Sequence, residues 1–132
     1  MDYTKDMKKA AHRHFQAAND LPPNHAKIAG YLYGIAAECA IKAAMINSGM
    51  RPRPVDERRD DPFYAHFETL KTLLRDTVSG RLSTELRRYA DNTSFMQYWD
   101  TSMRYSDGSQ IDSRWVARWR ENALQAMNAM DS

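Results

Sequence analysis

Three polar side chains are the first candidates for chemistry: Glu38, His66 and Arg104. Glu38 lies at the edge of an apolar stripe and four residues before Lys42, so a helix would place both on one face. This spacing is typical of an ordinary helix ion pair, and equally of a carboxylate that reaches into a partly buried polar site. His66 can act as an acid or base near neutral pH, or it can simply cap or pack a helix.

The stretch Trp99–Gly108 is the most distinctive part of the sequence. Arg104 and Tyr105 lie where a helix is expected to give way to a turn. Such a pair can hold a phosphate through the guanidinium fork and a phenol donor. The alternative is that Arg104 pairs with Glu38 or Asp107, while Tyr105 packs with its polar tip outward.

Several familiar catalytic and cofactor-binding patterns are absent from the sequence. It contains no glycine-rich phosphate loop, no serine nucleophile elbow and no zinc-type set of Cys and His. His12 and His14 are two residues apart on an expected helix and therefore point in different directions. We expect neither a metal site nor a cofactor.

Length and composition indicate one domain in a reducing compartment. The chain has 132 residues, 42% of them hydrophobic, and a single cysteine, Cys39, so it can form no internal disulfide. No run approaches the roughly 18 consecutive apolar residues of a membrane span, and the N-terminus shows no apolar signal-peptide region. We expect a cytoplasmic protein that does not enter a membrane.

The net charge of +2 is too small to predict nucleic-acid binding from bulk electrostatics. Arginines do cluster locally, and acidic residues within 56–61 offset the first cluster, which favours a solvated loop of mixed sign. The two clusters are Arg51, Arg53, Arg58 and Arg59, and then Arg114, Arg118 and Arg120.

Apolar periodicity predicts helices over about 4–19 and 24–48, with Asn24 as the N-cap of the second and Gly49 just beyond its end. Gly30 and Gly34 share a face of the second helix, which predicts the close approach of another helix. The expected inward stripe of this central helix is Ile28, Leu32, Ile35, Ala36, Cys39, Ala43 and Ile46.

The second half of the chain also has helical spacing. A loop over 50–61 leads to a helix that starts at Asp61-Pro62 and runs to Gly80, followed by a helix over 83–90. The sequence allows an interruption at Asp91-Asn92-Thr93, after which the apolar stripe is expected to continue through Phe95, Met96, Trp99 and Met103. A turn follows at 106–109, and Asp112 or Ser113 caps the last helix. The prediction is a single all-α domain over 1–132, an up-and-down bundle of four to five helices.

The central helix resembles the signature helix of the HEPN-domain family. The resemblance is strongest in Ala36–Ala43, and it extends to the order of His66, Trp99 and Arg104 with Tyr105 further along the chain. It covers most of the chain from Asn24 to Met127.

This resemblance implies a compact helical bundle that is often dimeric. Members of the family include RNases of toxin–antitoxin, CRISPR and phage-defence systems, and also non-catalytic companions of nucleotidyltransferases. The nuclease members carry an arginine followed by a histidine four to six residues later; two such motifs meet across a dimer and cut RNA without a metal. Here no histidine follows Arg104, and Arg59, which precedes His66 with six residues between them, lies in the charged loop before a middle helix.

Three hypotheses follow. The first is a HEPN-like domain that binds RNA, a nucleotide or a partner subunit in a defence or toxin–antitoxin system, as a homodimer or with a nucleotidyltransferase-type or other operon partner. The second is a metal-independent RNase in which Glu38, His66 and Arg104 form a composite catalytic site. The third is a structural helical adaptor. The further residues expected to contact a ligand are Lys42, Tyr105, Trp99 and Arg59.

Overall fold

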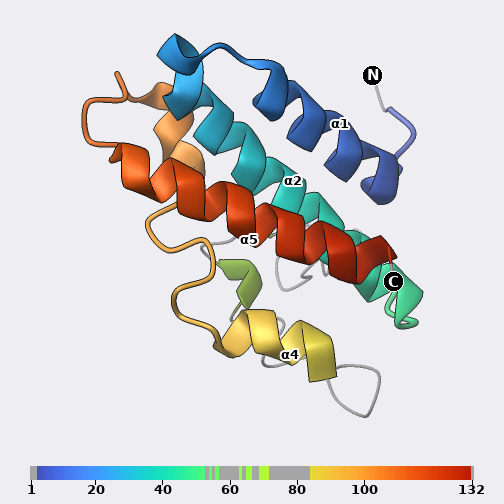
Figure 1. Cartoon of the computed structure of the whole chain (residues 1–132). Helices are drawn as coiled ribbons and strands as arrows, with labels where there is room; N and C mark the ends of the chain where they lie inside the picture. Colours follow the sequence, from blue (N-terminus) through green and yellow to red (C-terminus); the bar gives the residue numbers. More distant parts are fainter. Residues whose placement is uncertain are drawn as a thin grey trace.

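The computed structural model describes residues 3–52, 54, 56, 63, 65–66, 69–71 and 84–131, with only the backbone at 84, 85, 87 and 90. The described part contains four α-helices, α1 (Met7–Asp20), α2 (Ala26–Asn47), α4 (Thr84–Asp91) and α5 (Ser113–Asp131), and no strand. The prediction of an all-α protein is confirmed. Helix α2 lies between α1 and α5, and the four helices alternate in direction along the chain (Figure 1).

Helix α1 begins and ends close to its predicted limits. The Asp6 side chain accepts a hydrogen bond from the Lys9 amide at 3.0 Å, which satisfies an amide that the helix itself leaves unpaired. The helix stops at Leu21, because the two prolines that follow cannot continue its hydrogen-bond ladder. Its buried face consists of Ala11, Phe15 and Ala18.

Helix α2 is the core helix, but two details of its prediction are wrong. A 3₁₀ turn, η1 (Pro23–His25), precedes it, so Asn24 is not the N-cap; His25 occupies that position without a side-chain cap bond. Ile28 and Ile46 were expected inside, yet they are 57% and 41% exposed. The helix is apolar on nearly every face, so periodicity could not select the buried one.

Two tryptophans decide which face of α2 is buried. The Trp99 ring lies against Gly34, where an added Cβ would be 1.9 Å from its Cε2 atom. Trp119 of α5 lies against Gly30 in the same way, at 2.9 Å. The predicted close approach of another helix is confirmed at Gly30, where α5 packs with Trp119 and Val116, whereas Gly34 instead admits the indole ring of Trp99 from outside the α-helices.

Helix α4 ends at Asp91, so the interruption expected at 91–93 is confirmed, but residues 93–98 form turns and not the further helix that the apolar stripe predicted. Met96 and Tyr98 have φ values of +54° and +71°, which no α-helix contains. Helical geometry resumes only in the short 3₁₀ helix η5 (Thr101–Tyr105), which Asp100 caps. Phe95, Met96 and Trp99 are nevertheless buried as predicted.

Helix α5 closes the bundle along α2. Asp112 caps it as predicted, since its carboxylate accepts the Arg114 amide at 2.8 Å. The predicted turn at 106–109 is also present, with Gly108 at a φ of +85°. The loop expected over 50–61 and the helix expected from Asp61-Pro62 to Gly80 lie mostly outside the described residues. The buried residues of α5 are Val116, Trp119, Ala123, Ala126, Met127 and Met130.

One segment, Pro23–Asn47, is long and apolar enough by length and composition to cross a membrane. Its most apolar window is 67% buried within the protein, and the core helix of a soluble protein meets the same criterion. The cytoplasmic location therefore stays a prediction.

Candidate functional site

A buried polar cluster lies on α2 beneath His66. The Glu38 carboxylate contacts the Lys42 ammonium at 3.2 Å through Oε2 and the His66 ring at 3.0 Å, from Oε1 to Nδ1. Glu38 and Lys42 are only 6% and 5% exposed, whereas the His66 side chain is 49% exposed. The structure thus joins three of the predicted site residues, one of them at the protein surface.

The geometry of this cluster fixes the orientation of His66. A carboxylate only accepts hydrogen bonds, so Nδ1 of His66 carries the proton that points at Glu38. The other ring nitrogen, Nε2, is left as the side of the imidazole that can exchange a proton with a ligand. A histidine held in this way can act as a general base or acid.

Cys39, next to Glu38 on α2, has an unreactive thiol. Burial raises the pKa of its thiol to about 11, and the neighbouring Glu38 charge adds to this effect. Since the thiolate is the reactive form, this cysteine is unsuited to be a nucleophile near neutral pH.

Arg104 lies at a different place on the surface from the Glu38 cluster. Its Nη1 donates to the Tyr31 hydroxyl at 3.5 Å, and its guanidinium lies 5.0 Å from the Tyr105 ring centroid. Within the described residues Arg104 contacts neither Glu38 nor His66, and it forms no ion pair with Asp107. The alternative in which Arg104 pairs with Glu38 or Asp107 is therefore not what the structure shows; the Asp107 carboxylate instead accepts the Ser109 amide at 2.9 Å.

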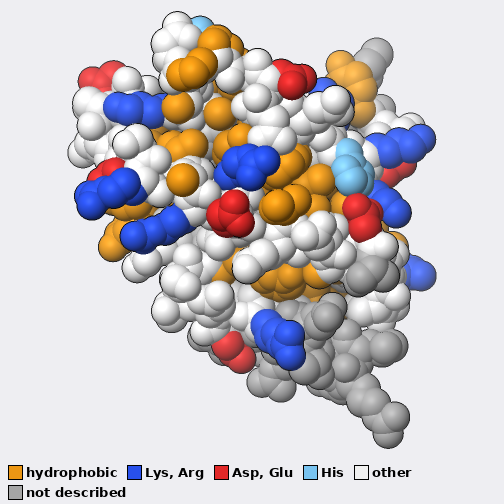
Figure 2. Space-filling view, viewed as in Figure 1, with side chains coloured by type: hydrophobic (Ala, Val, Ile, Leu, Met, Phe, Trp, Pro, Cys, Tyr) orange, Lys and Arg blue, Asp and Glu red, His pale blue; other side chains and the backbone are white. Residues whose placement is uncertain are grey.

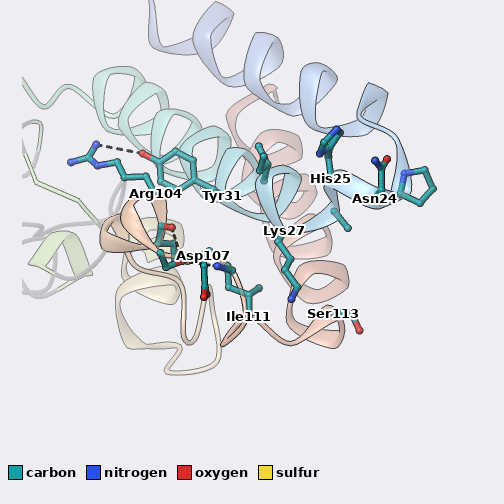
Figure 3. Close-up of a pocket in the computed structure, with 14 residues that line it drawn as sticks. Asn24, His25, Lys27, Tyr31, Arg104, Asp107, Ile111 and Ser113 are labelled. Atoms are coloured by element: carbon teal, nitrogen blue, oxygen red, sulfur yellow. Dashed lines mark hydrogen bonds between the residues drawn. The ribbon is translucent and has the colours of Figure 1, made fainter.

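Arg104 lines a pocket of about 690 Å³ between the start of α2 and the turn after η5 (Figure 3). This volume falls within the range of roughly 300–1,000 Å³ that is usual for ligand pockets. Its apolar wall includes the exposed Ile28, together with Met103 and Ile111. Polar side chains complete the lining: Asn24, His25, Lys27, Tyr31, Arg104, Ser106, Asp107 and Ser113.

The charged groups of this pocket leave it with a positive excess. Lys27 extends from α2 toward the turn that carries Asp107, and Arg104 projects from the far side of Tyr31 (Figure 3). Neither cation forms an ion pair in the described part of the chain. Asp107 is the opposing charge, and the hydrogen bond from the Ser109 amide, helped by Lys27, lowers the pKa of its carboxyl.

One stripe of α2 connects the pocket with the buried cluster. Tyr31 and Glu38 are seven residues apart, which is almost two full turns, so they share a face about 10 Å apart along the axis. Trp99 fills the space between them: it lies on Gly34, stacks on Tyr31 with ring centroids 5.6 Å apart, and donates to the Gly30 carbonyl at 3.2 Å. The predicted residues thus form two groups on one helix face, and Trp99 is a spacer between them.

Comparisons of this chain with protein-family models, with curated proteins and with solved structures find no match.

Some residues of these two groups were predicted and others were missed. Lys27 and Tyr31 were not predicted as ligand contacts; the seven-residue spacing from Tyr31 to Glu38 was the available signal. Arg59 lies outside the described residues. Among the described residues no group of His, Cys, Asp or Glu is arranged to hold a metal ion.

Proposed function

We propose that this chain is a HEPN-like helical domain that binds RNA or a nucleotide through its phosphate groups, in a defence or toxin–antitoxin type of system. The observation that carries the proposal is the pocket with Lys27 and Arg104 on its rim and no carboxylate paired to either cation within the described residues. A homodimer and an operon partner of the nucleotidyltransferase type belong to the same proposal, through the family resemblance.

The chemistry of the pocket suits a nucleotide. Arg104 is held between the Tyr31 hydroxyl and the Tyr105 ring, so its remaining N–H groups are oriented before a phosphate arrives. The apolar wall formed by Ile28, Met103 and Ile111 can take a base or sugar. A nucleotide whose phosphates meet the two cations and whose base packs on the apolar wall would contact both the polar and the apolar parts of the lining.

The test is a fluorescence titration with a labelled single-stranded oligouridylate and with a mant-labelled nucleoside diphosphate. Arg104→Ala should weaken binding of both probes by about 10- to 100-fold, the usual loss for charge-assisted hydrogen bonds. Lys27→Ala should reduce the salt dependence of oligonucleotide binding by about 0.7 in log–log slope per lost phosphate contact. Lys9→Ala on α1 is the control, because it removes the same charge from an exposed site far along the chain from the pocket. Equal affinities for all three variants would refute the proposal.

A metal-independent RNase is the second candidate, and the contact between Glu38 and His66 favours it. In this mechanism Nε2 of His66 accepts the proton of a 2′-hydroxyl, the 2′-oxygen attacks the adjacent phosphorus, and the bond from phosphorus to the 5′-oxygen breaks. The 5′-oxygen takes a proton from water, and the imidazolium returns its proton to the hydroxide that remains. Glu38 stabilises the imidazolium that forms. Arg104 belongs to the separate pocket group, so its role in this mechanism is to hold another phosphate of the same strand. The assay is RNA cleavage in EDTA, in which His66→Ala should abolish activity and Arg104→Ala should weaken substrate binding. Cleavage that survives in His66→Ala would exclude this mechanism.

The adaptor hypothesis would be favoured by a buried ion pair between Glu38 and Arg104. Glu38 pairs instead with Lys42 and His66, and Arg104 is exposed. No described contact speaks for a purely structural role of Arg104.

A further inference from the structure

A stacked pair of aromatic rings, the exposed Tyr98 and the partly buried Trp115, lies outside the pocket, where the 93–98 turns meet α5. Tyr98 is 58% exposed, and its ring stacks on Trp115 with centroids 4.5 Å apart and planes at 26°. Trp115 in turn lies 6.3 Å from the buried Trp119. We call the stacked pair of Tyr98 and Trp115 the aromatic shelf: one face of the Tyr98 ring rests on the protein and the other faces solvent.

The backbone holds this shelf in an unfavourable conformation. Met96 and Tyr98 both have positive φ, which bulky side chains rarely adopt. Two hydrogen bonds fix the loop: Trp119 donates to the Gln97 carbonyl at 2.9 Å, and the Met96 amide donates to Asn122 at 2.9 Å. Burial of the tyrosine does not offset the strain at Tyr98, because most of that side chain remains in water. Strain that persists around an exposed ring suggests a use for the ring at the surface.

The surroundings of the shelf are basic. Arg114 and Arg118 flank Trp115 on α5, and both are exposed. Arg114 is paired with Asp112 at 2.7 Å, whereas Arg118 forms no ion pair within the described residues. Figure 2 shows several Lys and Arg side chains over the first half of α5, with fewer Asp and Glu side chains among them. An anionic ligand with a flat aromatic part fits this combination.

We propose that the aromatic shelf and Arg118 form a second contact for single-stranded nucleic acid, in which a base stacks on Tyr98 and an adjacent phosphate meets Arg118. Single-strand binding sites combine a basic surface with aromatic rings on which bases stack. None of these residues lines the pocket, so the inference goes beyond the proposed function. The exposed arginines on either side of Trp115 favour an anionic ligand over an apolar protein partner.

The experiment is an anisotropy titration of the full chain with a fluorescein-labelled oligouridylate. Tyr98→Ala should weaken binding by about 5- to 100-fold, the range expected for loss of one stacked base. Tyr98→Phe keeps the ring and should bind as the wild type does. Tyr3→Ala is the matched control, because Tyr3 is 81% exposed and lies before α1. Arg118→Ala should weaken binding and lower the salt slope by about 0.7.

The outcomes separate this proposal from the previous one. If Tyr98→Ala loses oligonucleotide but keeps the mant-labelled diphosphate, while Arg104→Ala loses both, the shelf and the pocket are two sites. If Tyr98→Ala and Arg118→Ala bind the oligonucleotide like wild type, the shelf proposal is overturned and the pocket stands. If circular dichroism shows Tyr98→Ala to be unfolded, Arg118→Ala decides: weaker oligonucleotide binding supports the proposal, and binding like the wild type overturns it. Binding of neither probe by the wild type overturns both proposals.

Discussion

Replacing Gly34 by alanine tests the packing on which both groups of polar residues depend. The new Cβ would lie 1.9 Å from Cε2 and 2.0 Å from Nε1 of Trp99, distances that no real structure contains. Trp99 is a rigid ring whose Nε1 is bonded to the Gly30 carbonyl in a buried environment. The indole must therefore move as a unit, and it must leave that carbonyl.

The magnitude follows from three effects. Alanine gains about 1 kcal/mol of helix propensity over glycine. Overpacking a core costs about 1–3 kcal/mol, and an unpaired buried N–H costs about 1–3 kcal/mol more. The two losses outweigh the gain, so Gly34→Ala should reduce the free energy of unfolding by about 3 kcal/mol. In a chain of this size that corresponds to roughly 10 °C in Tm.

The assay is urea unfolding followed by far-UV circular dichroism. Gly30→Ala is the matched comparison: its Cβ would lie 2.9 Å from Trp119, a milder overlap, so its loss should be smaller. Adding Trp99→Leu to Gly34→Ala should recover part of the stability, which a double-mutant cycle measures as coupling. A Gly34→Ala protein as stable as the wild type, with an unchanged denaturant slope, would refute the reasoning.

Three further predictions concern ionisable groups. Glu38→Ala should lower the free energy of unfolding in urea by about 3 kcal/mol, because it leaves Lys42 buried and unpaired. A Glu38→Leu/Lys42→Met double variant should regain most of that loss. Equal stability of the single and double variants would contradict this. Cys39 should react with a thiol reagent at pH 7 about a hundredfold more slowly when folded than in urea, since its pKa of about 11 lies two units above the ordinary value of 9.0; fast labelling of the folded protein would disprove it. Hydrogen bonds from Arg114 lower the pKa of Asp112 from 3.8 to about 2. The ionised Asp112 therefore contributes to stability above pH 3.8, and this contribution is lost as the pH falls toward 2. Between pH 3.8 and 2 the urea midpoint of Asp112→Asn should fall less than that of the wild type.

The sequence predicted the helices better than it predicted their faces. Caps such as Asp112 and breakers such as the two prolines after Leu21 are local signals, and local signals are readable from sequence. The buried face of α2 depends on where Trp99 and Trp119 dock from distant parts of the chain. The positive φ values at Met96 and Tyr98 are likewise imposed by tertiary hydrogen bonds, so an apolar stripe there resembled a helix.

The site shows the same division between local and distant contacts. The contact of Glu38 with Lys42 follows from helix spacing, and the chain topology brings His66 to the same carboxylate. Arg104 contacts Tyr31, which lies on the same face of α2 as Glu38 and two turns before it. Helical spacing predicts which residues of α2 share a face, but it does not predict which position on that face a residue from elsewhere in the chain will contact. Lys27 was not predicted as a pocket residue, because its place in the lining depends on the turn around Gly108, against which the aliphatic part of its side chain packs.

The positions of the two chain ends have a practical consequence for studying this protein on a surface. Lys8 and Asp131 form an ion pair at 3.3 Å, so the first turn of α1 and the last turn of α5 lie together. The pocket adjoins the opposite end of α5, roughly 25 Å away along that helix. A surface attachment made near Lys8 or Asp131 would therefore lie at the end of α5 that is remote from the pocket.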